Sequence, residues 1–83
     1  ALAAELSPDI RINCIAPSLT KSKIASSVIK NNSIEESIAK MHPLKRIGAG
    51  ADSANLANFL LTPKSSWITG QIIAVDGGRS SIA

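Results

Sequence analysis

Tyrosine is absent from this 83-residue sequence, and one Phe and one Trp bring the aromatic content to only 2%. With so few aromatic residues for base stacking and no recognition motif, we expect no nucleic-acid partner. The single cysteine, Cys14, cannot form a disulfide within the chain. No apolar run approaches the roughly 20 residues that a membrane-spanning helix needs, so we expect no membrane partner either.

Candidate metal ligands are equally sparse. His42 is the only histidine, and it has no second histidine, cysteine pair or carboxylate cluster near it in the sequence, so we expect no metal site. A lone histidine beside Pro43 in a loop is typical of a solvent-exposed residue. Cys14 lies in an apolar segment and is expected to be a buried, inert thiol, and Trp67 is expected to be a packing residue.

The remaining composition is that of a folded domain, with 45% hydrophobic and 18% charged residues. Lys and Arg outnumber Asp and Glu by nine to six, and the net charge is +3. This excess is typical of a solvated surface; a small basic domain that binds an acidic or phosphate-bearing partner is an alternative. The sequence has no signal peptide, which favours a cytoplasmic location. Residues 1–83 are expected to lie in one domain.

The first residues have the composition of a helix end. Ala1 to Leu6 favour a helix, but no initiator Met and no capping side chain precede them. Pro8 ends this helix, because the residue before a proline disfavours the helical conformation. Six residues are too few for a stable isolated helix, so we expect the chain to be a fragment of a longer protein.

Two apolar segments rich in β-branched residues, Ile10 to Ala16 and Gln71 to Asp76, predict strands. Helical periodicity in residues 24–41 and 51–61 predicts a long helical connection between them. Strands joined in this way must be parallel, because an antiparallel return needs only a short turn. The sequence therefore predicts an α/β fold built on a βαβ unit.

Ligands of open α/β sheets bind outside the carboxyl ends of the strands. The loop from Pro17 to Lys23 follows the first predicted strand and is rich in small hydroxyl residues. Its hydroxyl and backbone groups suit a polar ligand. The alternative, which the residues alone leave open, is a strand-to-helix connection capped by Ser and Thr.

Four motifs, in this order, make the sequence resemble the C-terminal third of the short-chain dehydrogenase/reductase (SDR) family. They are LSPDIRINCIAP at 6–17, PLKRIG at 43–48, ITGQ at 68–71 and VDGG at 75–78. The resemblance covers almost the whole chain, and it looks closest to members that reduce 3-oxoacyl groups on acyl carrier protein. It implies the C-terminal part of a Rossmann-like, doubly wound parallel sheet, with the last two strands and their connecting helices.

The resemblance also implies a cofactor, NAD or NADP, with a slight preference for NADP. Hydride would pass between the nicotinamide and a small carbonyl or alcohol substrate, including substrates bound to acyl carrier protein. The family's cofactor-binding loop matches Pro17, Ser18, Thr20 and Ser22. Ser22 stands where the family has Thr and keeps the hydroxyl. Ser18 stands where the family has Gly, so it needs a backbone conformation that a side chain permits.

The family's catalytic Ser, Tyr and Lys would lie upstream, so no catalytic residue is expected here. The resemblance implies that residues 24–41 form a substrate lid. It also implies a homo-oligomer, a dimer or tetramer, in which Ala51 to Leu61 and Ile72 to Asp76 form the subunit contact. The alternative is a non-catalytic SDR-like fragment or paralogue that acts only in assembly.

Overall fold

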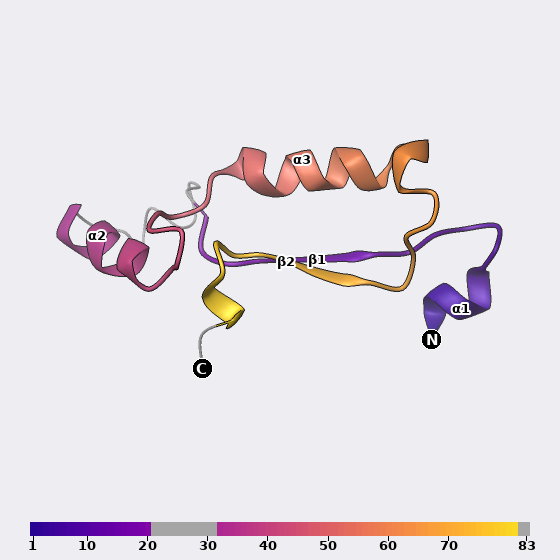
Figure 1. Cartoon of the computed structure of the whole chain (residues 1–83), viewed down its shortest axis with the longest axis horizontal. Coiled ribbons are helices and arrows are strands. Elements are labelled where there is room, and N and C mark those ends of the chain that lie inside the picture. The colour runs from indigo at the N-terminus through magenta and orange to yellow at the C-terminus, as the bar shows by residue number, and fades with distance from the viewer. Residues whose placement is uncertain (21–31, 82–83) are drawn as a thin grey trace.

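The computed structural model describes residues 1–20 and 32–81 (Figure 1). The elements are, in order, α1 (Leu2–Leu6), β1 (Cys14–Pro17), α2 (Asn32–Lys40), α3 (Gly50–Leu60), the 3-10 helix η2 (Pro63–Ser65), β2 (Ile72–Val75) and the 3-10 helix η3 (Arg79–Ser81). The described chain is elongated, with extents of 48 × 29 × 21 Å. The strands lie in the middle, and α1 and α2 lie at opposite ends (Figure 1).

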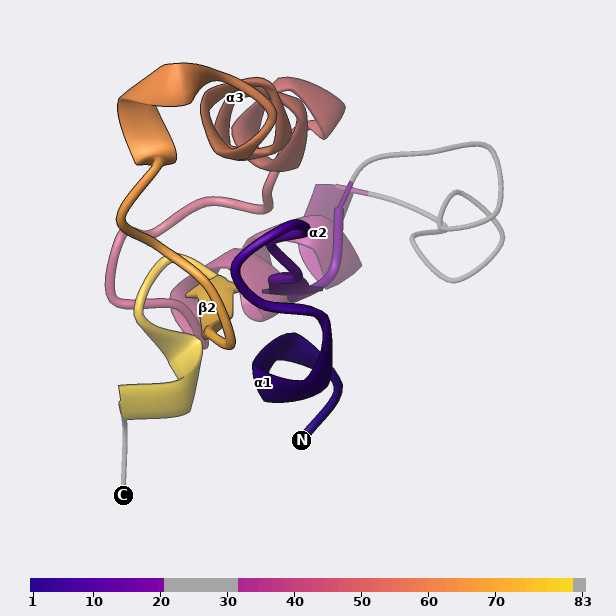
Figure 2. The ribbon, with the colours of Figure 1, turned by 90° about the vertical axis from the view of Figure 1, so that its right-hand side faces the viewer.

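The two strands pair in parallel, as the sequence predicted. Cys14 lies opposite Ile72, and Pro17 lies opposite Val75. α3 runs along one face of this pair, and α1 lies on the other side near one end (Figure 2). The arrangement is an α/β unit in which the carboxyl ends of both strands reach the same edge.

β1 is shorter than the predicted strand, Ile10 to Ala16. Regular pairing begins where the Cys14 N–H donates to the Gln71 carbonyl at 2.8 Å, although the Ile12 carbonyl already accepts from the Gly70 N–H at 2.7 Å. At Ile12 a side chain replaces the backbone acceptor, because the Ile12 N–H donates to the Thr69 hydroxyl at 3.0 Å. The segment before β1 therefore follows the neighbouring chain without forming a regular ladder.

Both helices that follow β1 correspond to predicted ones. Residues 24–31 of the predicted helical segment lie outside the described residues, and α2 matches its second part. α3 begins one residue before the prediction. The Asp52 carboxylate accepts a hydrogen bond from the Ala49 N–H at 2.8 Å, which satisfies one of the free donors at the start of this helix. Pro63 follows its end, as expected.

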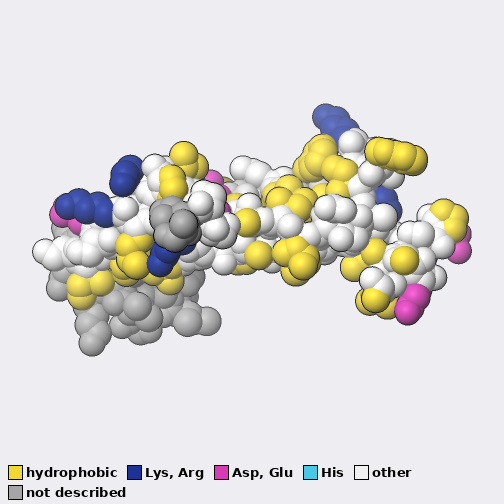
Figure 3. Space-filling model, turned by 60° about the horizontal axis from the view of Figure 1, so that its bottom comes forward, with side chains coloured by type: hydrophobic (Ala, Val, Ile, Leu, Met, Phe, Trp, Pro, Cys, Tyr) yellow, Lys and Arg dark blue, Asp and Glu magenta, His cyan; other side chains and the backbone are white. Residues whose placement is uncertain are grey.

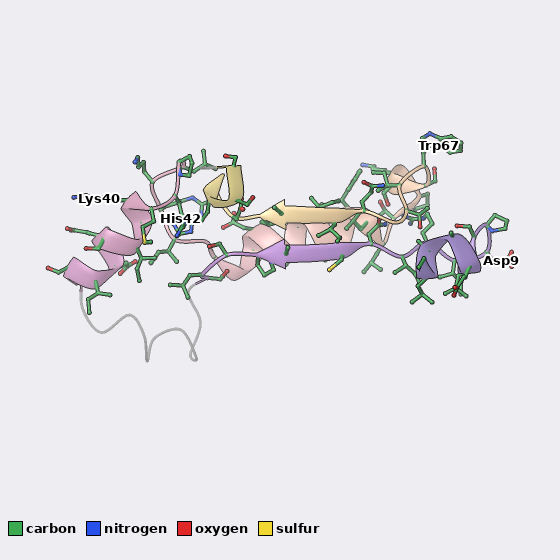
Figure 4. All side chains as sticks on the ribbon, turned by 90° about the horizontal axis from the view of Figure 1, so that it is seen from below. Asp9, Lys40, His42 and Trp67 are labelled. Carbon is green, nitrogen blue, oxygen red and sulfur yellow. The ribbon has the colours of Figure 1, made fainter. Side chains whose placement is uncertain are left out.

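Two expectations about burial were wrong. Cys14 is exposed, and Trp67 is 99% exposed and projects from the end of the molecule near α1 (Figure 4). Side chains alternate between the faces of a strand, and Cys14 shares with Ile72, itself 77% exposed, the face that α3 does not cover. Within the described residues Ile47 is the one buried apolar side chain, and Figure 3 shows apolar side chains at many places on the surface.

Candidate functional site

The loops that follow the two strands lie side by side. β1 continues into the segment from Ser18 to Thr20, and β2 continues into Asp76 and two glycines. The Ser18 N–H donates to the Val75 carbonyl at 3.3 Å, which extends the pairing of the strands into the loops. The predicted loop therefore starts at the edge of the sheet where ligands of open α/β folds bind.

A third segment, residues 42–48, completes the site. The Leu44 N–H donates to the Gly77 carbonyl at 3.0 Å, so this segment is fixed to the loop after β2. The Gly48 N–H donates to the Leu19 carbonyl at 3.3 Å, and Gly48 also forms a parallel bridge with Thr20. Three segments that are far apart in the sequence therefore converge at one end of the sheet.

A cavity of about 340 Å³ opens between these segments. Its lining comes from all three of them, from the end of β2 and from the start of α3: Ser18, Leu19, His42, Leu44, Arg46, Gly48, Asp52, Ala74, Val75, Asp76, Gly77 and Gly78. The volume is at the lower end of the range for small-molecule sites. It suits one end of a larger ligand better than the whole of it.

His42 is buried at this site, with 3% exposure, so the expected solvent exposure was wrong. Its Nε2 lies 2.9 Å from the Ser18 hydroxyl, and its Nδ1 lies 2.9 Å from the Ile38 carbonyl. A carbonyl can only accept, so Nδ1 carries the proton, and in the neutral ring Nε2 accepts from the hydroxyl of Ser18. Both ring nitrogens have partners within the fold, so burial of the ring leaves no polar atom without a hydrogen bond.

The predicted loop residues fall into two groups. Pro17, Ser18 and Thr20 lie together after β1, whereas Ser22 lies outside the described residues. Lys45, with φ 59°, is the one non-glycine residue of the described chain with positive φ, so Ser18 adopts a backbone conformation that its side chain permits. The Thr20 hydroxyl donates to the Ser18 carbonyl at 3.0 Å and closes the loop on itself.

The loop after β2 depends on glycine. Gly78 has φ 88°, and a Cβ there would lie 3.0 Å from Cγ of Pro43. The Asp76 carboxylate accepts from the N–H groups of Gly78 at 3.0 Å and Ser80 at 2.9 Å. The hydrogen bonds from Ser80, followed by that from Gly78, lower the pKa of Asp76. The glycine conformation and the hydrogen bonds of Asp76 therefore fix the shape of the turn that lines the cavity.

An ion pair joins the third segment to α3. The Arg46 guanidinium donates to both oxygens of Asp52, at 2.9 and 3.0 Å. These hydrogen bonds, and then that from the Ala49 N–H, lower the pKa of Asp52 to about 2. The same pair raises the pKa of Arg46.

The Thr20 hydroxyl can still accept a hydrogen bond from a ligand. The hydroxyl donates a hydrogen bond to the Ser18 carbonyl, and its oxygen can still accept one. Gly48 leaves room beside this hydroxyl, because a Cβ at Gly48 would lie 3.4 Å from the Thr20 Oγ1.

Ligands of open α/β sheets bind at the carboxyl ends of the strands. This rule, which predicted the loop after β1 as a site, also applies to the loop after β2. The Asp-Gly-Gly run directly follows a predicted strand, so its place at the site was open to prediction. No local pattern pointed to His42, because its partner Ser18 is 24 residues away in the sequence.

Residues 1–20 and 32–81 contain neither a metal-binding cluster nor a membrane-spanning helix. Among them no group of three or more His, Cys, Asp and Glu side chains could hold a metal ion. None of the helices in these ranges has the length and apolar character needed to cross a membrane.

Comparison with known proteins identifies the family. Residues 1–80 match a protein-family model described as enoyl-(acyl carrier protein) reductase, and short-chain dehydrogenase/reductase SDRA of Arabidopsis thaliana is 40% identical over 81 residues. The chain belongs to the short-chain dehydrogenase/reductase family. The match to SDRA covers 98% of this SDR chain and 32% of the relative.

Solved SDR structures share the fold. Glucose/ribitol dehydrogenase of Brucella melitensis superposes with a TM-score of 0.85 at 31% identity, over 94% of this chain and 31% of that one. YwfH, an NADPH-dependent reductase involved in bacilysin biosynthesis, gives 0.84 at 35% identity, over 99% and 35% of the two chains. These neighbours confirm the Rossmann-like fold class, and the SDR chain spans about a third of their length.

Proposed function

We propose that this chain is the C-terminal part of an NAD(P)-dependent oxidoreductase and that its loop from Pro17 to Ser22 faces the nicotinamide. The observation that carries the proposal is the position of Ser18 and Leu19, which follow the carboxyl end of β1 and line the cavity of about 340 Å³ directly before Thr20. The relatives, which are dehydrogenases and reductases, support the same activity class.

The bound cofactor would supply the hydride, and this chain would bind and orient its nicotinamide end. The Thr20 oxygen and the backbone of the loop would hold the carboxamide, and Ser22 would contribute a further hydroxyl. The hydrogen bonds from Thr20 to the Ser18 carbonyl and from Ser18 to His42 fix the start of the loop, Ser18 to Thr20, before the ligand arrives. A fixed loop loses less conformational entropy on binding.

NADP is the form of the cofactor that we expect to bind better. YwfH is NADPH-dependent and 35% identical, which supports testing NADPH first. The substrate would be a small carbonyl or alcohol compound. The family model named for enoyl-(acyl carrier protein) reductase supports including substrates on acyl carrier protein.

The proposal extends to assembly and location. Exposed apolar side chains on α3 and β2, such as Phe59 at 40% and Ile72 at 77%, support a homo-oligomer in which these elements form the subunit contact. α2 would belong to the substrate lid. We place the enzyme in the cytoplasm.

The test is production of the protein from its complete coding sequence, followed by calorimetric titration with NADPH and NADH. Oxidation of both would then be assayed with a panel of ketones, aldehydes and acyl-carrier-protein thioesters. Micromolar cofactor binding with turnover supports the proposal. A folded oligomer that binds neither cofactor would contradict it and favour the non-catalytic assembly role.

Thr20→Val provides the residue-level test, since it removes the hydroxyl at constant shape. We expect the KM for the cofactor to rise about 2- to 10-fold, as for loss of one net hydrogen bond. Thr62→Val is the matched control, because the Thr62 hydroxyl also donates to a carbonyl, that of Phe59 at 2.8 Å, but at the other end of α3. An equal KM change in both variants would contradict a role for Thr20 in cofactor binding.

A further inference from the structure

His42 links the loop after β1 to the end of α2. Its Nε2 meets the Ser18 hydroxyl and its Nδ1 meets the Ile38 carbonyl, each at 2.9 Å. Figure 4 shows His42 between α2 and the ends of the two strands. We propose that His42 is a positioning residue, which holds Ser18 and thereby keeps the start of the cofactor-facing loop, Ser18 to Thr20, in its binding conformation. The inference rests on the proposed function.

The contact to α2 is a helix-end contact. Ile38 lies in the last turn of α2, where backbone carbonyls have no partner further along the helix. Its carbonyl accepts from the Met41 N–H at 3.0 Å and from His42 Nδ1. The imidazole is therefore anchored at Nδ1, and its Nε2 points in a fixed direction, toward the loop.

The packing around the ring leaves it little freedom. His42 is 3% exposed, and Gly77 lies behind it. A Cβ at Gly77 would lie 3.5 Å from Cβ of His42, and the φ of 59° at Gly77 also favours glycine. The loop after β2 thus backs the imidazole, and a rotation that broke the bond to Ser18 would need the surrounding loops to move.

The Ser18 side chain makes this link possible. A glycine at this position, as the family resemblance implies, would have no hydroxyl to donate. In this chain the hydroxyl joins residues 24 apart in the sequence, so it fixes the start of the loop relative to α2. This side-chain contact orders the start of the loop more than the loop backbone alone would.

Loss of the link is expected to act on cofactor binding. The loop would hold the nicotinamide in the ground state and the transition state alike, and an interaction that acts uniformly changes KM more than kcat. We therefore expect Ser18→Ala to raise the KM for the cofactor about 2- to 10-fold, with kcat changed less than twofold.

Two substitutions of His42 separate its two contacts. His42→Asn keeps a donor for the Ile38 carbonyl but is too short to reach Ser18, so it is expected to raise the KM as Ser18→Ala does. His42→Gln places an amide oxygen near the former Nε2, where it accepts from Ser18, so it is expected to restore most of the affinity. Ser37→Ala removes an exposed hydroxyl from α2 and is the matched control, with an unchanged KM.

The measurements are made on the protein from its complete coding sequence: steady-state KM and kcat, cofactor Kd by calorimetry, and the thermal midpoint. Coupling is tested in the double variant Ser18→Ala/His42→Asn, whose KM should match that of the single variants. If His42→Asn and His42→Gln lower the thermal midpoint equally and leave the KM unchanged, His42 is structural and the inference is wrong. If the unsubstituted protein binds neither cofactor, the proposed function fails first and the inference fails with it.

Discussion

Arg11 caps the end of α3 from a distant part of the chain: its Nη2 donates to the carbonyl of Leu60 at 2.9 Å. Its Nη1 donates at 3.0 Å to both the carbonyl and the hydroxyl oxygen of Ser65, a residue with 1% exposure. The last carbonyls of a helix have no partner within the helix, and a cation is favourable at that end. One guanidinium thus ties the segment before β1 to the end of α3.

Replacing Arg11 is expected to destabilise the protein. Arg11→Met keeps much of the length but removes the charged donor from the carbonyls of Leu60 and Ser65, which keep only their bonds from the Ser65 hydroxyl and the Ile68 N–H. A hydrogen bond to a charged group contributes about 1.5–3 kcal/mol, so we expect the free energy of unfolding to fall by about 2–3 kcal/mol. Urea denaturation of the complete protein measures it.

Arg79→Met is the matched control, because Arg79 is exposed in η3. Its effect should stay within about 0.5 kcal/mol. Arg11→Lys should recover only part of the loss, since a single ammonium cannot reproduce the forked geometry of a guanidinium. Equal stabilities of Arg11→Met and Arg79→Met would show that the capping contact contributes nothing.

Gly78 gives a second prediction about stability. Gly78→Ala would force an L side chain into φ 88° and place its Cβ 3.0 Å from Cγ of Pro43. We expect a loss of about 1–3 kcal/mol. Gly50→Ala is the control, because nothing lies within 4 Å of a Cβ there. In a helix that substitution should be neutral or stabilise by up to about 1 kcal/mol. The prediction fails if the two variants are equally stable.

The sequence was informative where a local rule decides the outcome. Apolar β-branched runs located both strands, and the length of the connection between them required parallel pairing. The first strand was drawn too long because Ile12 pairs with the Thr69 side chain, a contact that periodicity does not report. The burial of His42 depends on Ser18, and no pattern within a few residues of His42 encodes that contact.

Exposure of Cys14 and Trp67 was mispredicted for another reason. Apolar residues predict that a face is covered, but they do not say which segment covers it. In the described chain α3 covers one face of the strands, and Cys14 lies on the other. The positional rule for α/β sheets found the loop at Ser18 and Thr20, while the roles of these residues in binding stay predictions.

The ion pair between Arg46 and Asp52 predicts a pH dependence. The pKa of Asp52 falls from 3.8 to about 2 in the folded state, so the pair adds stability above pH 4 that is lost as the pH falls toward 2. Asp52→Asn should remove this part of the acid dependence. Between pH 2 and pH 6, the urea midpoint of the variant would change less steeply with pH than that of the unsubstituted protein.

Arg46→Gln supplies the complementary test. It removes the partner that lowers the pKa of Asp52 most, so it should also flatten the pH dependence, and adding Asp52→Asn should remove only the smaller part that the Ala49 N–H contributes. The effect should shrink in concentrated salt, because the Arg46 side chain is 57% exposed. A slope that both substitutions leave unchanged would show that the pair does not couple to folding. The depressed pKa of Asp76 acts in the same direction and would remain in these variants.

The last prediction concerns the 83 residues on their own. Ile47 is the one buried apolar side chain of the described chain, whereas Leu61, Trp67 and Ile72 are 83%, 99% and 77% exposed. Ordering the backbone costs about 1–2 kcal/mol per residue, and so little apolar burial does not offset it. We therefore expect the 83 residues expressed alone to be unfolded or to aggregate, and to become ordered only with the remaining polypeptide or neighbouring subunits. Circular dichroism and size-exclusion chromatography with light scattering test this. Cooperative thermal unfolding of a monomer would contradict it, because it would show that these residues form a self-sufficient domain.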